Sequence, residues 1–162
     1  MLQKFAWIFF LSVVPVSEIR GAMIYAFSAL DGVEQLASAY LLSVIGNFLP
    51  VPFVILLFRP IVKWLKTTKL FGRLAHWMEE RTSRKAKELS RATAGALLIF
   101  VAIPFPTTGA WTGSMIASLL DIRMKYALPA ILAGIMLAGL IVALLCGGIL
   151  NLGALGEWLI TK

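Results

Sequence analysis

Long and short apolar runs alternate along the chain, and the two kinds end differently. The long runs are residues 36–58 and 126–150, and neither contains a charged residue. A helix needs about 20 apolar residues to cross a bilayer. The two runs therefore predict two full transmembrane helices, the first kinked near Asn47, Pro50 and Pro52, where Asn47 offers a polar contact.

The short runs are residues 5–16 and 94–103, and each leads into a proline and then a polar turn that contains glycine. The first turn reads SEIRGA and the second reads PFPTTGAWTG. Apolar runs of about 10 to 14 residues are typical of re-entrant or interfacial segments. Interrupted backbone at membrane depth is tolerated only where protein covers it or it lines a wet cavity, so the two turns are the predicted working site.

Composition excludes a soluble globular protein, since 60% of the residues are hydrophobic, 14% are charged and the mean hydropathy is +0.89. The single cysteine, Cys146, excludes a disulfide framework and a cysteine-based zinc site. No small-residue cleavage pattern follows the N-terminal run, so we expect that run to be retained. We expect no metal and no cofactor, and because no hydrolase or phosphate-loop motif occurs, we predict that the protein is not an enzyme.

The basic excess is concentrated in one connector, residues 59–91, which holds ten of the fifteen Lys and Arg against three Glu, a net charge of +7. The positive-inside rule explains this cluster better than a nucleic-acid partner does, so no nucleic acid is expected. Apolar residues of the connector recur every three or four positions between lysines and arginines. This pattern predicts an amphipathic helix on the anionic cytoplasmic leaflet, with membrane lipids as partners.

The two halves of the chain, residues 1–58 and 92–150, repeat one order of short arm, polar break, short arm, acidic residue and long span. The matching residues are Pro15, Gly21, Ala22, Ser28, Leu30 and Asp31 in the first half and Pro104, Gly109, Ala110, Ser118, Leu120 and Asp121 in the second. We therefore predict a single all-α membrane domain over residues 1–162, in which two units of re-entrant helical hairpin plus transmembrane helix form an inverted repeat, followed by a tail at 151–162.

An inverted repeat places the connector and the loop 121–125 on the cytoplasmic side and both termini outside, in agreement with the charge bias. The alternative is four kinked crossings, because prolines occur inside transmembrane helices. That alternative puts Arg123 and Lys125 outside, against the charge rule. The predicted location is the cytoplasmic (inner) membrane, and a homodimer is expected because two crossings enclose little cavity.

Glu18 and Arg20 stand in the first turn, where charge at membrane depth costs about 2.5 to 3.5 kcal/mol and usually marks function. Arg20 would hold an anion through its fork of donors, and Glu18 would exchange a proton because burial favours its neutral form. A direct pair between them needs a broken backbone, for which Gly21 is the predicted place. The alternative is a static ion pair that only closes the hairpin.

The second turn offers hydroxyl groups and backbone amides without charge. Thr107, Thr108 and Gly109 follow the prolines that stop the incoming arm, and amides freed at a helix N-terminus can bind anions. Gly109 and Gly113 also form a GxxxG spacing, for which helix packing is the equal alternative.

The two turns, the basic connector and the length together resemble the family described as putative small multidrug export proteins, which is similar to the DedA-like, or VTT-domain, superfamily. The resemblance implies movement of lipids or lipid-linked phosphates, often with proton dependence, through acidic and basic residues near re-entrant loops. Glu18 and Arg20 match that pattern at the first turn. The second turn departs from it, because it contains no arginine and Arg123 lies beyond it.

The sequence thus favours a membrane transporter or flippase for an anionic lipid or lipid-linked phosphate, with proton coupling through Glu18. One alternative is efflux of small amphipathic drugs, for which Trp7, Trp111 and Glu18 would serve cationic molecules. The other is a noncatalytic membrane assembly factor, in which the connector docks partners and the turns only pack.

Overall fold

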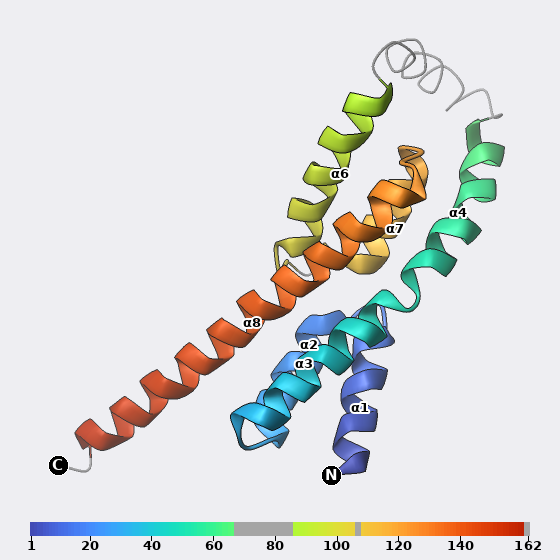
Figure 1. The fold of residues 1–162 in the computed structure, drawn as a ribbon. Coiled ribbons are helices and arrows are strands. Elements are labelled where there is room, and N and C mark those ends of the chain that lie inside the picture. Colours follow the sequence, from blue (N-terminus) through green and yellow to red (C-terminus); the bar gives the residue numbers. More distant parts are fainter. Residues whose placement is uncertain (67–85, 106–107, 161–162) are drawn as a thin grey trace.

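The computed structural model describes residues 1–66, 86–105 and 108–160, and these ranges form helices and turns without a β-strand (Figure 1). The predicted all-α class is therefore confirmed. The segment 67–85 lies outside the described residues, so the amphipathic connector helix stays a prediction. The helices are α1 (Leu2–Val13), α2 (Glu18–Ala29), α3 (Val33–Phe48), α4 (Val51–Lys66), α6 (Ala86–Ala102), α7 (Ala110–Leu119) and α8 (Met124–Ile160).

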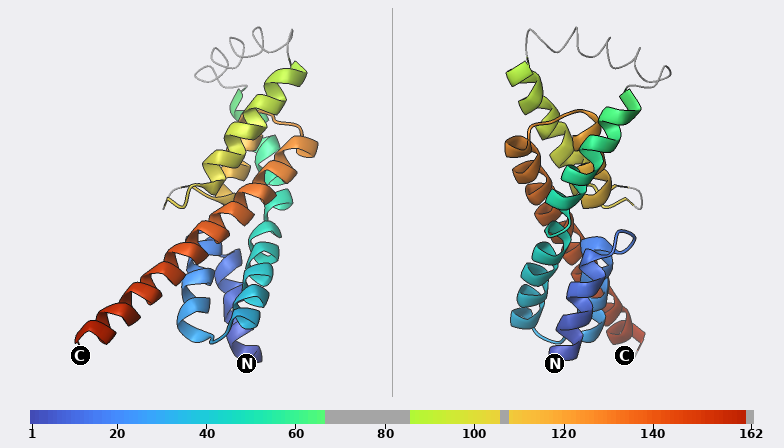
Figure 2. Two further views of the ribbon diagram at one scale, coloured as in Figure 1. Left: turned by 60° about the vertical axis from the view of Figure 1, so that its left-hand side comes forward. Right: turned by 90° about the vertical axis from the view of Figure 1, so that its right-hand side faces the viewer.

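The short helices form two antiparallel pairs whose turns meet midway along the molecule (Figure 1). Helices α1 and α2 pack on each other and on α3 at the end that carries the N-terminus. Helices α6 and α7 lie toward the opposite end, where α7 packs against α4 and α6 packs against α8. The long α8 runs beside both pairs and contacts α2, α3, α6 and α7, so it ties the two halves together (Figure 2).

Two helical stretches, Val33–Trp64 and Met124–Gly148, are long and apolar enough to cross a bilayer. The first is divided at Leu49 and Pro50, where α3 ends and α4 begins, so the predicted kink is confirmed. Proline is tolerated at this place because the first turn of a helix has no partner for its backbone N–H. The Pro50 carbonyl then accepts the first bond of α4, from Val54 N at 2.9 Å.

The long helices leave many large apolar side chains on their outer faces. On α3, α4 and α8 these exposed residues include Leu41, Ile45, Phe53, Leu56, Leu57, Leu140, Leu144 and Leu145. A protein in water rarely leaves so extended an apolar surface uncovered, whereas lipid chains cover it without cost. The outer surface therefore agrees with the composition in indicating a membrane protein.

The interior is built mostly from aliphatic side chains on α2, α4, α6 and α8. Its largest fully buried members include Ile19, Met23, Ile55, Val101, Ile131 and Ile135. Small residues let the helices approach closely within this core. A Cβ at Gly113 would lie 2.6 Å from Val101 Cγ2, so Gly113 brings α7 against α6.

Gly134 makes the contact between α6 and α8 possible, and its replacement by alanine is expected to destabilise the protein. A Cβ there would lie 2.7 Å from Val101 Cβ and 2.9 Å from the Leu98 carbonyl oxygen, which cannot rotate away. Such overpacking costs about 1 to 3 kcal/mol. We expect a thermal unfolding midpoint lower by about 3 to 10 °C in the purified protein.

The matched control is Gly95→Ala, since Gly95 lies inside α6 with no atom within 4 Å of an added Cβ. Alanine is the better helix former by up to about 1 kcal/mol, so this variant should keep or raise the midpoint. A Gly134→Ala protein as stable as the Gly95→Ala protein would contradict the proposed helix contact.

Candidate functional site

The first predicted turn lies between α1 and α2 and is closed by its own backbone. Glu18 N donates to the Val14 carbonyl at 2.9 Å, and the Ser17 hydroxyl donates to the Leu11 carbonyl at 2.8 Å. Glu18 itself adopts a left-handed conformation, with φ of 51°, which is uncommon for a residue other than glycine. This conformation turns the chain and directs the Glu18 side chain toward the second turn.

The prediction that the backbone breaks at Gly21 is wrong, because Gly21 lies within α2 and the break precedes Glu18. The turn is made by the residues around Pro15 and by the left-handed Glu18. A Cβ at Gly21 would lie 2.5 Å from Ser17 Oγ, so glycine at this position leaves room for the hydroxyl that holds the turn.

The second turn lies between α6 and α7 and is held by Thr108. Its hydroxyl donates to the Ile103 carbonyl at 2.7 Å and accepts from Phe105 N at 3.2 Å. Thr107 lies outside the described residues. Gly109 is the N-cap residue of α7, has a positive φ of 157°, and accepts the first helical hydrogen bond from Gly113 N at 2.8 Å. The two glycines of the GxxxG spacing therefore lie one turn apart, and each stands where an added Cβ would collide, with Glu18 at Gly109 and with Val101 at Gly113.

Glu18 caps α7 from the other half of the chain. The N-cap residue of α7, Gly109, has no side chain to cap the helix, and Glu18 Oε1 accepts a hydrogen bond from Trp111 N at 3.2 Å. A carboxylate at this place satisfies a free amide and complements the positive end of the helix dipole. In return, Trp111 Nε1 donates to the Val13 carbonyl at the end of α1 at 3.1 Å. The two turns are thus interlocked.

Arg20 adds a second connection between the turns. Its Nη2 atom lies 3.7 Å from Glu18 Oε2 and 3.4 Å from Thr108 Oγ1, and its Nη1 atom donates to the Phe105 carbonyl. The expected pairing of Glu18 with Arg20 is therefore present, although both residues belong to the first turn of α2. Their side chains are largely buried, with 7% and 16% of their surfaces exposed.

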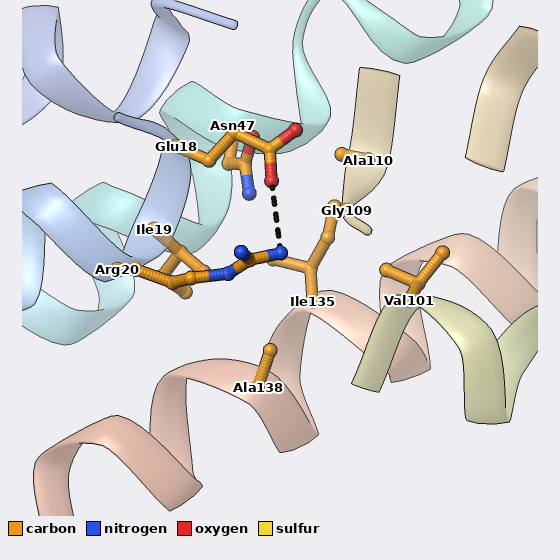
Figure 3. A pocket seen from close by; sticks show the side chains of 9 residues that line it. All are labelled: Glu18, Ile19, Arg20, Asn47, Val101, Gly109, Ala110, Ile135 and Ala138. Atoms are coloured by element: carbon orange, nitrogen blue, oxygen red, sulfur yellow. Dashed lines mark ion pairs between the residues drawn. The ribbon is translucent and has the colours of Figure 1, made fainter. Parts of the chain in front are cut away.

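The interlocked turns border a recess that also reaches α3 and α8 (Figure 3). It is narrow, without room for a water molecule, and is lined by Glu18, Ile19, Arg20, Asn47, Val101, Gly109, Ala110, Ile135 and Ala138. Glu18 and Arg20 are the ionisable residues in this lining, and their charges balance. Within the described residues no three His, Cys, Asp or Glu side chains come together in a way that could hold a metal ion.

The structure thus brings together Glu18, Arg20, Asn47 and Gly109 from the predicted site, with Thr108 beside Arg20. Asn47 is 1% exposed, and no hydrogen-bond partner for its amide lies among the described residues. Trp7 lies elsewhere, on the outer face of α1, where it packs edge-to-face on Phe10. Trp111 was predicted only as an aromatic contact for cations, and the structure gives it a different part, that of joining the two turns.

Comparison with known proteins gives one family. A family model described as "Putative small multi-drug export protein" matches residues 18–141. The matched region begins at Glu18, so α1 and the residues that join it to α2 lie outside the match, whereas Glu18, Arg20, Asn47, the second turn and most of the apolar part of α8 lie within it. No curated protein and no solved structure matched the chain.

Proposed function

Since the chain belongs to the family of putative small multi-drug export proteins, we propose that it is a membrane transporter whose cargo passes where its two turns interlock. The observation that carries this proposal is the exchange of contacts between the turns. Glu18 caps α7, Trp111 donates to the end of α1, and Arg20 holds the α6–α7 turn. These contacts are polar and few, so they can separate and re-form while the apolar halves stay intact.

We further propose that α1–α2 and α6–α7 are re-entrant pairs of an inverted repeat, in a protein that crosses the cytoplasmic membrane more than once. Three features support this. Both pairs turn midway along the long helices, at a depth where a bilayer interior would lie (Figures 1 and 2). The matched residues Leu30 and Leu120 each follow the last residue of α2 or α7 directly, and the two pairs point in opposite directions along the molecule. The relationship to the DedA-like superfamily stays a prediction.

Cysteine labelling tests this topology in a Cys146→Ala background. A cysteine at Glu34, in the first turn of α3, should react with an impermeant reagent from outside, and one at Arg123, just before α8, should react only from inside. Glu34 and Arg123 are both exposed, and the starts of α3 and α8 lie at opposite ends of the molecule. A lack of reaction at either position therefore cannot be attributed to burial of the cysteine. Reaction of both positions from the same side would refute the inverted repeat.

For the cargo we propose an anionic lipid or a lipid-linked phosphate, moved with a proton. Arg20 supplies fixed donors where the two turns interlock, and arginine suits oxyanions because its planar fork matches their geometry. Glu18 is a buried carboxylate next to that cation, and its protonation would weaken its hold on Arg20 and on the tip of α7 together. Proton binding to Glu18 and separation of the two turns would then be one event.

A second candidate is efflux of small amphipathic drugs, and the family description favours it directly. The buried Glu18 would then attract cationic molecules. Trp7 and Trp111 do not form a common aromatic site with it, since Trp7 lies on the outer face of α1.

Reconstitution of the full chain into liposomes separates these candidates. A labelled lipid-phosphate panel should cross the bilayer faster than in empty liposomes, with the rate set by a pH gradient. Transport of cationic dyes without lipid movement would favour drug efflux. Movement of neither class would refute the transporter and leave an assembly factor as the explanation.

A further inference from the structure

Asn47 is a buried polar residue whose hydrogen-bonding groups are unused. It lies on α3 with 1% of its surface exposed, and neither Nδ2 nor Oδ1 has a partner among the described residues. Arg20 Nε is likewise buried without a partner. Both groups face the recess between the interlocked turns (Figure 3). Buried polar groups are hydrogen-bonded in the great majority of cases, so two unused ones in a single recess indicate something that binds there.

We propose that this recess is the binding site for a phosphate-type oxyanion, free or on a lipid headgroup, and that Asn47 is one of its binding residues. The inference rests on the proposed function and deepens it. Three donors converge on the recess: Asn47 Nδ2, Arg20 Nε and the backbone N–H groups at the start of α7. A helix N-terminus favours negative charge, and the guanidinium adds a full positive charge.

The Glu18 carboxylate now occupies the place that such an oxyanion needs. It accepts the Trp111 amide and lies beside Arg20, and an added Cβ at Gly109 would overlap its oxygens. The oxyanion and the ionised Glu18 therefore compete for the same donors. Protonation of Glu18 removes its charge and weakens its hold on these donors, so an oxyanion displaces it more easily at acidic pH.

Among the described residues that line the recess, Glu18 and Arg20 are the ionisable ones that take part in this competition. The recess lining from α3, α6, α7 and α8 is Asn47, Val101, Ala110, Ile135 and Ala138, and Gly109 completes it beside α7. Glu18 and Arg20, both on α2, are the ionisable residues of that lining. Apart from the ionisation of the phosphate probe itself, the pH dependence of binding should consequently follow Glu18.

The recess is closed around the Glu18 carboxylate and has no room for a water molecule beside it. An oxyanion can therefore enter only by taking the place of that carboxylate. A drug-sized molecule, for which pockets have volumes of about 300 to 1,000 Å³, does not fit, and an acyl chain would have to remain outside among the lipid-facing helices.

The test uses the purified full chain with Asn47→Leu, which keeps the side-chain size and removes the polar atoms. Inorganic phosphate and short-chain phosphatidic acid are the probes, and a matched diacylglycerol is the uncharged control. In the wild type we expect the thermal unfolding midpoint to rise with the charged probe, more at acidic than at alkaline pH. Asn47→Leu should weaken this binding about tenfold or more, as loss of a hydrogen bond to a charged group predicts.

Without probe, Asn47→Leu should raise the midpoint by about 3 °C or more, because unsatisfied buried groups are gone. Ser43→Ala is the control, since Ser43 is buried one turn away but donates to its own helix at Ala39 and does not line the recess. It should bind the probe as the wild type does. Asn47→Asp, which adds a negative charge, should lose binding most strongly at alkaline pH.

A response to both charged probes supports an oxyanion site for free phosphate, and a response to phosphatidic acid alone supports a lipid headgroup. The inference is overturned by equal binding in Asn47→Leu and the wild type, by an equal response to diacylglycerol, or by no response to any probe. If the probe binds in a way that depends on Asn47 but the protein moves nothing across liposomes, the binding site is supported and the transporter function is refuted.

Discussion

Replacing Gly109 by alanine is expected to abolish transport, because the added methyl group would take the place of the Glu18 carboxylate. A Cβ at Gly109 would lie 2.5 Å from Glu18 Cδ and closer still to one carboxylate oxygen. Glu18 would have to leave the tip of α7, and Arg20 would lose its partner. Loss of the cap and strain at a φ of 157° together predict destabilisation of about 2 kcal/mol. Liposome transport and thermal unfolding measure the two effects.

Gly32→Ala provides the matched control for this variant. Gly32 also has a positive φ, of 101°, but it lies in the turn before α3 and no atom stands within 4 Å of an added Cβ. Alanine at position 32 strains the backbone but does not collide with another side chain, so the stability of the protein should fall while transport remains. Transport by Gly109→Ala at the wild-type rate would show that the contact between Glu18 and Gly109 is dispensable.

Local signals predicted most of the fold. The apolar length of residues 36–58 and 126–150 identified the two stretches that are long enough to cross a bilayer, and Pro50 marked the boundary between α3 and α4. The length of an apolar run and the position of a proline are both properties of neighbouring residues, so a single sequence is enough to recognise them. Helix ends were less accurate: α6 begins at Ala86, well before the apolar run at 94–103, because polar residues continue a helix without an apolar signal.

The charged part of the site was predictable for the same reason, since Glu18 and Arg20 stand out within an apolar segment. The partner of Glu18 was not predictable, because the contact with Trp111 N joins residues 93 positions apart. Any residue offers a backbone amide, so no side-chain pattern marks the one that a distant carboxylate will cap. Gly21 was misassigned because glycine permits a break but does not require one, and the left-handed Glu18 made the turn instead.

Glu18→Gln is expected to abolish the pH dependence of transport while the fold persists. The glutamine oxygen can accept the Trp111 amide as the carboxylate does, so the cap on α7 is kept. The side chain no longer titrates, and Glu18 and Arg20 are the ionisable residues of the recess lining. Apart from the change caused by ionisation of the oxyanion itself, the variant should hold its oxyanion with the same affinity across the pH series, near the acid limit of the wild type. Transport rates and probe binding across a pH series measure this.

Glu18→Ala separates the charge of Glu18 from its capping role. Alanine removes the acceptor as well, so α7 loses its cap at a cost of about 1 kcal/mol, whereas glutamine keeps it. If Glu18 and Arg20 form only a static ion pair, the two variants should be equally unstable. Both would leave Arg20 as an unpaired charge and lower the free energy of unfolding by about 3 to 5 kcal/mol. Arg20 has two further acceptors, at Phe105 and Thr108, which would hold the guanidinium in Glu18→Gln and favour the first outcome. A Glu18→Gln protein that folds normally and transports with the wild-type pH profile would show that Glu18 carries no proton.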